Sequence, residues 1–580
     1  MILPSKSLGS LFLPLVCLSL CLTNCREEPE NTQKNLSLWL NLPPVVASTA
    51  SLSFKPLPCS LKEGPNDPLY KYQWHLENTG QSNFFASHPV GLPGEDLRLQ
   101  NTWKGGTWGN GVLVSVVDDG VFLEHEDLLP NAAEGSINFV SSTNFLPANN
   151  PGGSEATHGT AVAGIISGRA GNGIGISGVA PCSHVIGYNY LISPTDSNLI
   201  KSLSENKSVM VSNNSWGAID GTGLSYPAPA VFYESIEKAI SQNRSGLGSI
   251  ILLAAGNGAQ RFNSTFEVDN SNYDGYATHF GVLATAAVLN NGQRAVYSEK
   301  GANLWVSGLS GRDGVVNTGI TTTDNIGLTN DWGYNPGGVS NGTNSTVSVN
   351  YSDRKYTNTF NGTSAAAPTV AGVVALLLEK YPKLSWRDTK KILALSARKN
   401  DATDSDWKTT GAGLPYSYNL KYGFGVVQAD RALEIASSWT SIGGSSSLKQ
   451  FSKTFSPNLN IGEVGPVSYD LSISSSGITK IEFIDVYLTS DHTESGELYL
   501  SLQAPNSGLE IEIMEPRLCY SSAEKGLPII SCGKMTDQKF GVSAFLDQPA
   551  DGIWKINATD SLPNGKTGSI QTVRIVFYGS

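Results

Sequence analysis

The chain has 580 residues, more than one ordinary hydrophobic core can organise, so we expect at least two domains. Its apolar content of 40% and aromatic content of 9% are those of a globular protein. The formal net charge of −11 argues against a nucleic-acid partner.

The N-terminal stretch is typical of a secretion signal. Lys6 supplies a basic start, and residues 8–22 are mostly apolar but too few for a membrane-spanning helix. The stretch ends in Cys-Leu-Thr-Asn-Cys, which resembles a bacterial lipoprotein signal in which Cys25 is acylated and anchors the protein to a membrane. Asn24 departs from the small residue usual before that cysteine, so plain secretion stays open. We expect an exported protein with a signal over residues 1–25 and a disordered tether over residues 26–64.

Seven cysteines are present, and three of them belong to the signal. The other four are Cys59, Cys182, Cys519 and Cys532, an even number that favours two disulfides in an exported protein, with three connectivities. Proximity along the chain favours Cys519–Cys532, which leaves Cys59–Cys182.

Two segments place a chemically active side chain beside an element that can hold it. Residues 114–117 form a β-branched run that predicts a strand, and Asp118, Asp119 and Gly120 follow directly. Further on, His158 opens a predicted helix rich in small apolar residues. Taken alone, Asp-Asp-Gly is usually a turn after a strand, and a single histidine is usually structural.

Ser364 lies in Gly-Thr-Ser, shortly before an apolar run over residues 370–378, which places it at the start of a buried helix. Pro368 fits the first turn of that helix. A hydroxyl at this position is close to unpaired N–H groups and to the positive end of the helix dipole, where an oxyanion is stabilised. The pattern equally fits an ordinary Ser/Thr helix cap.

A serine nucleophile needs a base, and the base needs an orienting carboxylate. Asp118, His158 and Ser364 supply these groups in the order Asp, His, Ser. Together with Asn257, which follows a buried strand over residues 250–255, these segments resemble the catalytic segments of the subtilisin-like serine proteases. The resemblance implies that Asp118 orients His158, that His158 is the general base and acid, that Ser364 is the nucleophile, and that Asn257 donates to the oxyanion.

Predicted strands and helices alternate up to about residue 436. Strands are expected at residues 209–211, 249–255 and 282–288, and helices at residues 229–242 and 386–399. This alternation predicts an α/β fold with a doubly wound, mostly parallel sheet and with catalytic groups at the carboxyl ends of its strands. We place this peptidase domain at residues 65–436 and a Ser/Gly-rich linker at residues 437–448.

Residues 449–580 predict a β-sandwich, because alternating strands such as residues 481–488 are separated by turn signals. Residues 491–498, 552–556 and 573–580 resemble the P domain of kexin/furin-like convertases, a jelly-roll-like sandwich that packs on the catalytic domain in relatives.

Several acids resemble the kexin/furin-like branch more than the bacterial subtilisins. Asp119 follows Asp118, an acid stands four residues after the Trp of a Ser-Trp-Gly strand, and three further acids follow Asn257 at the spacing of that branch. The resemblance implies a pocket for Arg or Lys floored by two acids, with Asp119 helping to bind the preceding substrate residue. The residues implied to bind substrate are Asp119, Ser215, Trp216, Gly217, Asp220 and Asp274.

The resemblance also implies two calcium sites, since Ca²⁺ binds carboxylate, amide and backbone carbonyl oxygens. The first set is Asp67, Asp127 and Asn172 through their side chains, with Ile174 and Ile176 through their carbonyls. The second set is Asp220, Asp269 and Glu299.

The leading hypothesis is an exported, calcium-dependent serine endopeptidase, monomeric and acting on proteins or peptides after Arg or Lys. A broad-specificity degradative subtilase would keep the chemistry and change the substrates. A catalytically silent surface protein would bind partners through the sandwich, but the intact set of Asp118, His158, Ser364 and Asn257 argues against silence.

Overall fold

The computed structural model describes residues 53–61, 64–81, 91–140, 156–259, 267–312, 319–325, 334–335, 350–411, 413–463, 465–505, 507–522 and 529–580. The predicted signal, its Cys25 and most of the predicted tether lie outside these residues. In the described part of the chain, none of the helices has the length and apolar character needed to span a membrane.

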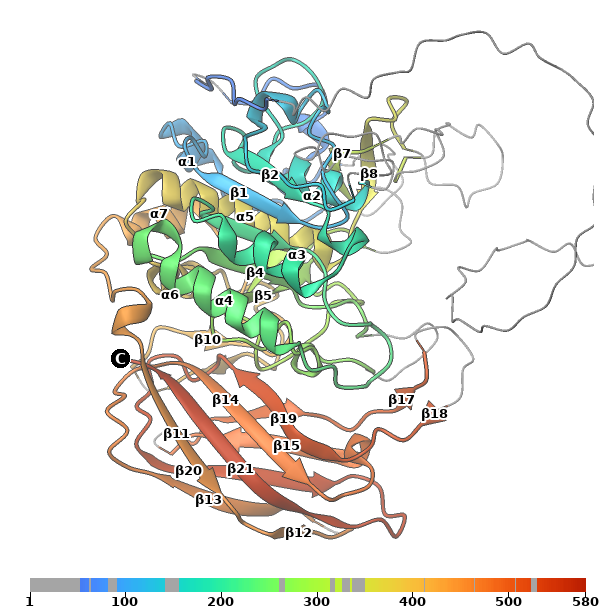
Figure 1. The fold of residues 1–580 in the computed structure, drawn as a ribbon, viewed down its shortest axis with the longest axis vertical. Helices are drawn as coiled ribbons and strands as arrows, with labels where there is room; N and C mark the ends of the chain where they lie inside the picture. Colours follow the sequence, from blue (N-terminus) through green and yellow to red (C-terminus); the bar gives the residue numbers. More distant parts are fainter. Residues whose placement is uncertain are drawn as a thin grey trace, which may run out of the picture. The chain divides into compact units, whose positions relative to one another are not determined.

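A six-stranded sheet forms the centre of the first domain (Figure 1). Its order is β2-β1-β3-β4-β5-β6, and every neighbouring pair is parallel. Every residue of the two central strands β3 and β4 is buried, as expected for a parallel sheet covered on both faces. The strands are β1 (Leu113–Val117), β2 (His184–Tyr188), β3 (Val211–Asn214), β4 (Ile250–Ala254), β5 (Val282–Val288) and β6 (Val306–Leu309).

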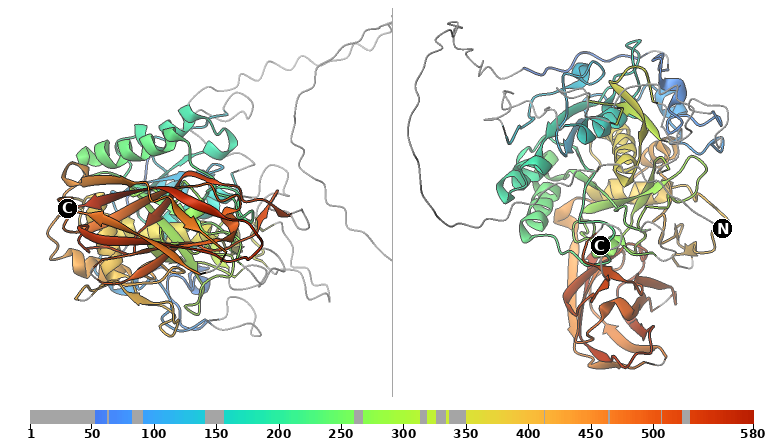
Figure 2. Two further views of the ribbon diagram at one scale, coloured as in Figure 1. Left: turned by 90° about the horizontal axis from the view of Figure 1, so that it is seen from below. Right: turned by 90° about the vertical axis from the view of Figure 1, so that its right-hand side faces the viewer.

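Helices cover both faces of this sheet, which confirms the doubly wound α/β prediction. The long helix α5 (Thr363–Lys380) packs against α2 and against β3, β4, β5 and β6, while α3 and α4 lie on the opposite side (Figure 2). The other helices are α1 (Gln100–Lys104), α2 (His158–Ser167), α3 (Asp196–Ile200), α4 (Ala230–Gln242), α6 (Trp386–Ser396) and α7 (Ala429–Ala436). Two small antiparallel pairs complete the domain, β7 (Ile320–Thr323) with β8 (Tyr356–Phe360) and β9 (Lys408–Thr409) with β10 (Ser417–Tyr418).

The second domain is the predicted β-sandwich, built from two antiparallel sheets. One has the order β11-β21-β14-β19, with β12 also paired to β21, and the other has the order β13-β20-β15-β16. Trp554, Phe545 and Phe577 pack between the sheets as fully buried aromatic side chains. The strands are β11 (Lys449–Phe455), β12 (Leu459–Ile461), β13 (Val467–Ile473), β14 (Ile481–Ser490), β15 (Leu498–Gln503), β16 (Glu510–Met514), β17 (Cys519–Tyr520), β18 (Ile529–Ile530), β19 (Met535–Val542), β20 (Gly552–Asp560) and β21 (Gly568–Gly579).

Both expected disulfides are present. Cys59 is bonded to Cys182, and Cys519 to Cys532, with Cα atoms 5.6 and 5.3 Å apart. The first disulfide attaches the N-terminal segment to the residues just before β2, across 123 positions of sequence.

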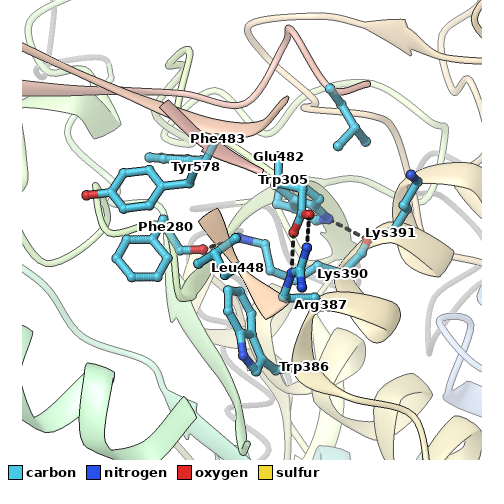
Figure 3. Close-up of a pocket in the computed structure, with 11 residues that line it drawn as sticks. Phe280, Trp305, Trp386, Arg387, Lys390, Lys391, Leu448, Glu482, Phe483 and Tyr578 are labelled. Atoms are coloured by element: carbon cyan, nitrogen blue, oxygen red, sulfur yellow. Dashed lines mark hydrogen bonds and ion pairs between the residues drawn. The ribbon is translucent and has the colours of Figure 1, made fainter. Parts of the chain in front are cut away.

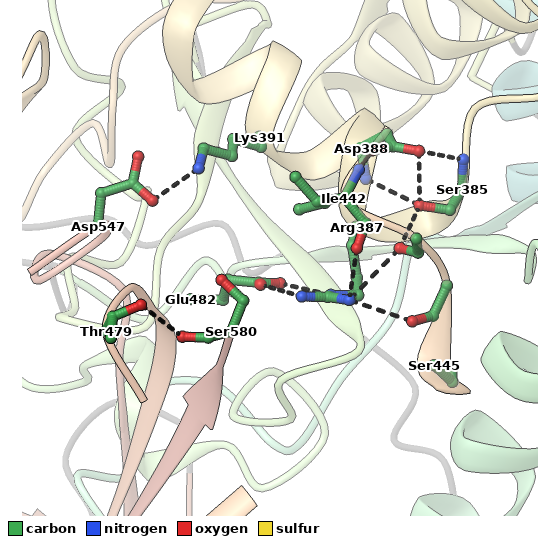
Figure 4. Close-up of polar contacts among 12 residues, drawn as sticks. Ser385, Arg387, Asp388, Lys391, Ile442, Ser445, Thr479, Glu482, Asp547 and Ser580 are labelled. Carbon is green, nitrogen blue, oxygen red and sulfur yellow. Dashed lines mark hydrogen bonds and ion pairs between the residues drawn. The ribbon is translucent and has the colours of Figure 1, made fainter. Parts of the chain in front are cut away.

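The Ser/Gly-rich segment between the two domains is held in place rather than free. Arg387 of α6 donates from Nη1 to the carbonyls of Ile442, Gly443 and Gly444 at 3.1 to 3.4 Å, and it forms a two-pronged ion pair with Glu482 of β14 (Figure 4). Composition predicted a linker here, and these hydrogen bonds fix its backbone to the start of α6.

A buried lysine lies at the same junction (Figure 3). Lys390 donates from Nζ to the carbonyls of Phe280 and Val282 at 2.7 and 2.9 Å, with its ammonium 4.1 Å from the centre of the Trp305 ring. Burial lowers the pKa of Lys390 to about 7, and the negative charge of Glu482 offsets part of this decrease. The junction therefore combines a buried arginine and a buried lysine with aromatic packing.

Candidate active site

Three of the predicted site residues lie just beyond the carboxyl ends of neighbouring strands. Asp118 follows β1 and Ser215 follows β3, while Asn257 comes shortly after β4. In the sheet, β2 lies next to β1 on one side and β3 lies next to β1 on the other. The strand order therefore reverses between β1 and β3, which flank the switch point of the sheet. Open α/β sheets bind their ligands at this point.

Asp118 and His158 are hydrogen-bonded to each other. Oδ1 of the fully buried Asp118 lies 2.8 Å from Nδ1 of His158, whose side chain is 24% exposed. Gly159 permits this approach, because a Cβ at that position would collide with the carbonyl oxygen of Gly120. The pair can therefore hold a proton on Nδ1 and leave Nε2 free to act as a base.

The two neighbouring carboxylates control the charge of this histidine. Burial lowers the pKa of His158, but the charge and hydrogen bond of Asp118, together with the charge of Asp119, outweigh burial and raise that pKa to about 9. The imidazolium formed during proton transfer is therefore stabilised.

Asp119 caps the helix that carries the histidine. Its carboxylate accepts the backbone N–H groups of Thr157, His158 and Gly159 at 3.2, 3.0 and 2.8 Å. A carboxylate in this position satisfies N–H groups that have no partner within the helix and favours the positive end of its dipole. Both oxygens are thus engaged at the start of α2, and a contact with substrate stays a prediction.

Ser364 is the second residue of α5, and Pro368 explains how its backbone is held. The first-turn prediction for Pro368 is wrong, because α5 begins at Thr363 and Pro368 falls in the second turn. There it lacks the N–H that would bond to the carbonyl of Ser364. The Oγ of Ser215 donates to that carbonyl instead, at 2.9 Å.

The hydroxyl of Ser364 also points toward Ser215. Ser364 Oγ donates to the carbonyl of Ser215 at 3.2 Å, and within the described residues it makes no hydrogen bond to His158. Catalytic hydrogen bonds are often loose in the free enzyme. Rotation about the Cα–Cβ bond of Ser364 changes only the direction of this hydroxyl, since the backbone is fixed by Ser215.

Asn257 is oriented by the residue before the nucleophile. Its Oδ1 accepts from the backbone N–H and the hydroxyl of Thr363 at 2.8 and 3.0 Å, which assigns the other amide position to Nδ2. Nδ2 makes a long hydrogen bond of 3.4 Å to Asp220. The amide donor thus lies between the nucleophile segment and a group of buried acids.

The Ser-Trp-Gly segment connects the active-site strands to those acids. Trp216 donates from its ring N–H to the carbonyl of Val117 at 2.8 Å and packs against Tyr190 and Tyr276. A Cβ on Gly217 would collide with the carboxylate of Asp274, so glycine is required there. Asp274 in turn accepts from the N–H of Ala218 at 3.0 Å.

The acids predicted for the specificity pocket and for the second calcium site all line one small cavity of about 10 Å³; they are Asp220, Asp269, Asp274 and Glu299. Burial is the main cause that raises the pKa of each of them, to about 6 for Asp274 and about 7 for Asp269. Mutual repulsion adds to the shift for three of them, and Glu299 is raised well above its usual range. No Lys, Arg or His of the described residues forms an ion pair with any of the four. The cavity has room for an ion or a water molecule, whereas an arginine side chain requires the lining residues to move.

The first predicted calcium set also comes together. Asp67 accepts the N–H groups of Gly171 and Asn172, while Asp127 accepts from Asn172 Nδ2 at 2.7 Å and from the N–H of Ile176 at 2.8 Å. Burial raises the pKa of Asp127 to about 7, and the charge of Asp67 adds to the increase. Two buried carboxylates and an amide are the groups that Ca²⁺ prefers, but in this structure Asn172 turns its NH₂ group toward Asp127 and its Oδ1 toward the N–H of Ile174, so only the two carboxylates fit a cation directly. The N–H groups of Ile174 and Ile176 point to Asn172 and Asp127, and the predicted role of their carbonyls stays a prediction.

Sequence reasoning missed two residues that build the site. Tyr297 accepts the N–H of Gly362 at 3.1 Å, and Gly362 has a φ of +81° that suits glycine just before α5. Thr363 fixes the amide of Asn257. Tyr297 lies in no motif, and the Gly-Thr-Ser motif gives Thr363 no partner, because each residue contacts a segment about 65 or more positions away.

Comparisons with known proteins agree with this geometry. The model of the Subtilase family matches residues 109–425. Neuroendocrine convertase 2 of Caenorhabditis elegans is 31% identical over 561 residues, covering 89% of this chain and 76% of the relative. The Aeromonas extracellular serine protease of Aeromonas sobria is 29% identical over 546 residues, covering 85% and 84%.

The fold has also been solved in a similar protein. The crystal structure of the serine protease of Aeromonas sobria superposes with a TM-score of 0.76 at 24% identity, covering 92% of this chain and 100% of that one. The similarity includes both domains. The chain belongs to the subtilase family and is a subtilisin-like serine endopeptidase, related to the proprotein convertases and to the Aeromonas protease.

Proposed function

We propose that this chain is an exported, calcium-dependent serine endopeptidase that cleaves after Arg or Lys, with Asp118, His158 and Ser364 as its triad. The observation that carries the catalytic assignment is the 2.8 Å hydrogen bond between buried Asp118 and His158. It lies at the switch point of the sheet, where Ser215 also holds the backbone carbonyl of Ser364. The specificity is supported by the buried acids beside it, which lack a basic partner among the described residues.

In this mechanism, Asp118 holds the proton of His158 on Nδ1. The Ser364 hydroxyl rotates from the Ser215 carbonyl to Nε2, gives up its proton and attacks the substrate carbonyl. His158 then passes the proton to the leaving amine, and the acyl group on Ser364 is hydrolysed by water through the same base.

Asn257 stabilises the oxyanion in this proposal. Its Nδ2 exchanges the long hydrogen bond to Asp220 for one to the oxyanion, beside N–H groups of the first turn of α5. Removing such a donor lowers turnover about a hundred- to a thousandfold in the general case.

Calcium belongs to the proposal through the two acidic sets. Asp67, Asp127 and Asn172, with the carbonyls of Ile174 and Ile176, would hold one ion. Asp220, Asp269 and Glu299 would hold a second, and Asp220 would also face the substrate cation together with Asp274. In both places the ion supplies positive charge to buried carboxylates, which are costly without it.

The basic substrate side chain would meet Asp274 and Asp220. The test is a set of fluorogenic peptides that differ only at the residue before the cleaved bond, with Asp274→Asn and, as a control, the exposed Asp196→Asn. We expect kcat/KM for Arg and Lys to exceed that for Leu and Phe by about 100-fold or more, and Asp274→Asn alone to remove the preference. Cleavage mainly after Leu or Phe would refute the pocket and favour the broad degradative subtilase.

Export is supported by the two disulfides and by the relative named as extracellular. The signal over residues 1–25, the tether over 26–64, the peptidase domain over 65–436, the linker over 437–448 and the P domain over 449–580 complete the proposed organisation. Anchoring through an acylated Cys25, and a monomeric state, are parts of the same proposal. Mass spectrometry of the mature N-terminus tests the anchor, since acylation at Cys25 and a cut elsewhere give different masses.

A further inference from the structure

A buried histidine and two buried acids converge at one end of the β-sandwich. His492 lies two residues after β14, Glu497 ends a short 3₁₀ helix directly before β15, and Asp560 is the last residue of β20. One nitrogen of His492 and one carboxylate oxygen of each acid all lie within 4.8 Å of one another. The cluster connects the two sheets, because β14 belongs to one and β15 and β20 belong to the other.

One polar atom of each side chain is held by neighbours outside the cluster. Nδ1 of His492 lies 3.1 Å from the carbonyl oxygen of Glu494 and 3.3 Å from its N–H. Oδ1 of Asp560 accepts the N–H of Leu562 at 3.0 Å. Oε1 of Glu497 accepts from Asn564 at 2.8 Å and from Lys566 at 3.1 Å. A histidine that binds a metal usually donates its other N–H to a carbonyl or carboxylate, as the shorter contact of Nδ1 allows.

The remaining polar atoms of the three side chains lack sufficient donors. Nε2 of His492 lies 3.3 Å from Oδ2 of Asp560, and Oε2 of Glu497 is buried without a hydrogen-bond partner among the described residues. Glu497 as a whole is 8% exposed. A doubly protonated His492 would satisfy Asp560 but would leave Oε2 of Glu497 unpaired, which is costly for a buried carboxylate. A cation among the three would satisfy all of them.

The geometry and the ligand types select the class of cation. Ligands about 2.0 to 2.1 Å from a tetrahedral ion lie about 3.3 Å apart, which matches the separation of Nε2 and Oδ2. An imidazole with two carboxylates suits zinc, whereas Ca²⁺ prefers oxygen ligands alone. We propose that His492, Glu497 and Asp560 bind one zinc ion, which joins the two sheets of the sandwich independently of the catalytic residues.

The test uses the full chain with Ser364→Ala to prevent self-digestion. Metal-free protein is titrated in separate arms with zinc chloride and calcium chloride, and binding is measured by calorimetry together with the melting temperature. We expect one zinc per chain and a higher melting temperature with zinc, through a site that calcium does not fill.

Glu497→Gln and Asp560→Asn are the test variants, and each should weaken zinc binding by about 100-fold or more. Glu494→Gln is the matched control, because its side chain also lies near Lys566 but is not a member of the cluster. Zinc binding by Glu497→Gln equal to that of the parent would overturn the proposal.

Anomalous diffraction at the zinc edge keeps the test decisive if a variant fails to fold. A peak among the three side chains of the otherwise unchanged chain supports the site. Zinc found only at other histidines, or no peak after soaking at saturating zinc, refutes it.

Discussion

Arg387→Met tests how strongly the junction joins the two domains. Arg387 is 1% exposed and its guanidinium bonds to Glu482 and to three carbonyls of residues 442–444. Methionine keeps the volume but leaves Glu482, whose side chain is 13% exposed, without a partner. Breaking a buried pair in this way costs about 3–5 kcal/mol.

The matched control is Arg431→Met. Arg431 pairs with Glu434 within α7, where the two side chains are 50% and 67% exposed, so we expect a change of at most about 0.5 kcal/mol. A double variant, Arg387→Met with Glu482→Gln, should recover about 1–3 kcal/mol of the loss, because no unpaired charge is left at the junction.

The assay is urea unfolding of the Ser364→Ala chain, followed by near-ultraviolet circular dichroism and by tryptophan fluorescence. Because two domains need not unfold together, the free energy of unfolding is compared only where both probes give the same transition. If Arg387→Met changes the free energy of unfolding no more than Arg431→Met does, the buried pair does not stabilise the junction and the reasoning fails.

Three further predictions concern the active site and the first calcium set. Ser215→Ala should lower kcat/KM by about 5- to 150-fold, because the backbone carbonyl of Ser364 loses its hydrogen-bond donor. Adding Pro368→Ala to this variant should restore part of the rate, since alanine supplies a backbone N–H at that position. A double variant as slow as Ser215→Ala would contradict this role of Ser215. kcat/KM should rise with pH up to an apparent pKa near 9, because His158 acts as a base only when it is neutral. Asp119→Asn should move this rise to lower pH, because it removes a negative charge that raises the pKa of His158. A pH profile unchanged by Asp119→Asn would exclude that coupling. Removing calcium with a chelator should lower the melting temperature of the parent protein. The decrease should be smaller in Asp127→Asn, which has already lost a calcium ligand. Equal decreases in the two proteins would remove Asp127 from the first calcium set.

The sequence predicted the architecture well because its signals are local. The buried run of β5, the helix that follows Ser364 and the alternating strands of the sandwich each show their type within about ten residues. Proximity along the chain also predicted Cys519–Cys532, and Cys59–Cys182 followed by elimination. The position of Pro368 was misjudged, since the start of α5 is set by Gly362 and Tyr297 rather than by the apolar run.

The parts that the sequence could not predict depend on distant contacts. Composition made residues 437–448 a linker, and only the contacts of Arg387 and its neighbours in the chain, such as Asp388, show that this segment is held. Asp119 could be assigned to substrate by resemblance, yet its engagement with the first N–H groups of α2 is visible only in three dimensions. The zinc cluster joins His492 to Asp560 across 68 positions, a distance that no motif spans.

Covalent labelling with a fluorophosphonate is the most direct test of the central claim, that His158 activates Ser364 as a nucleophile. On mature, calcium-loaded protein we expect one adduct per chain, located on Ser364 by peptide mass spectrometry, and none in Ser364→Ala. Labelling should slow by several orders of magnitude in His158→Ala, since the hydroxyl is a weak nucleophile without its base. Failure of the parent to form the adduct, or equal labelling of the parent and Ser364→Ala, would contradict the account.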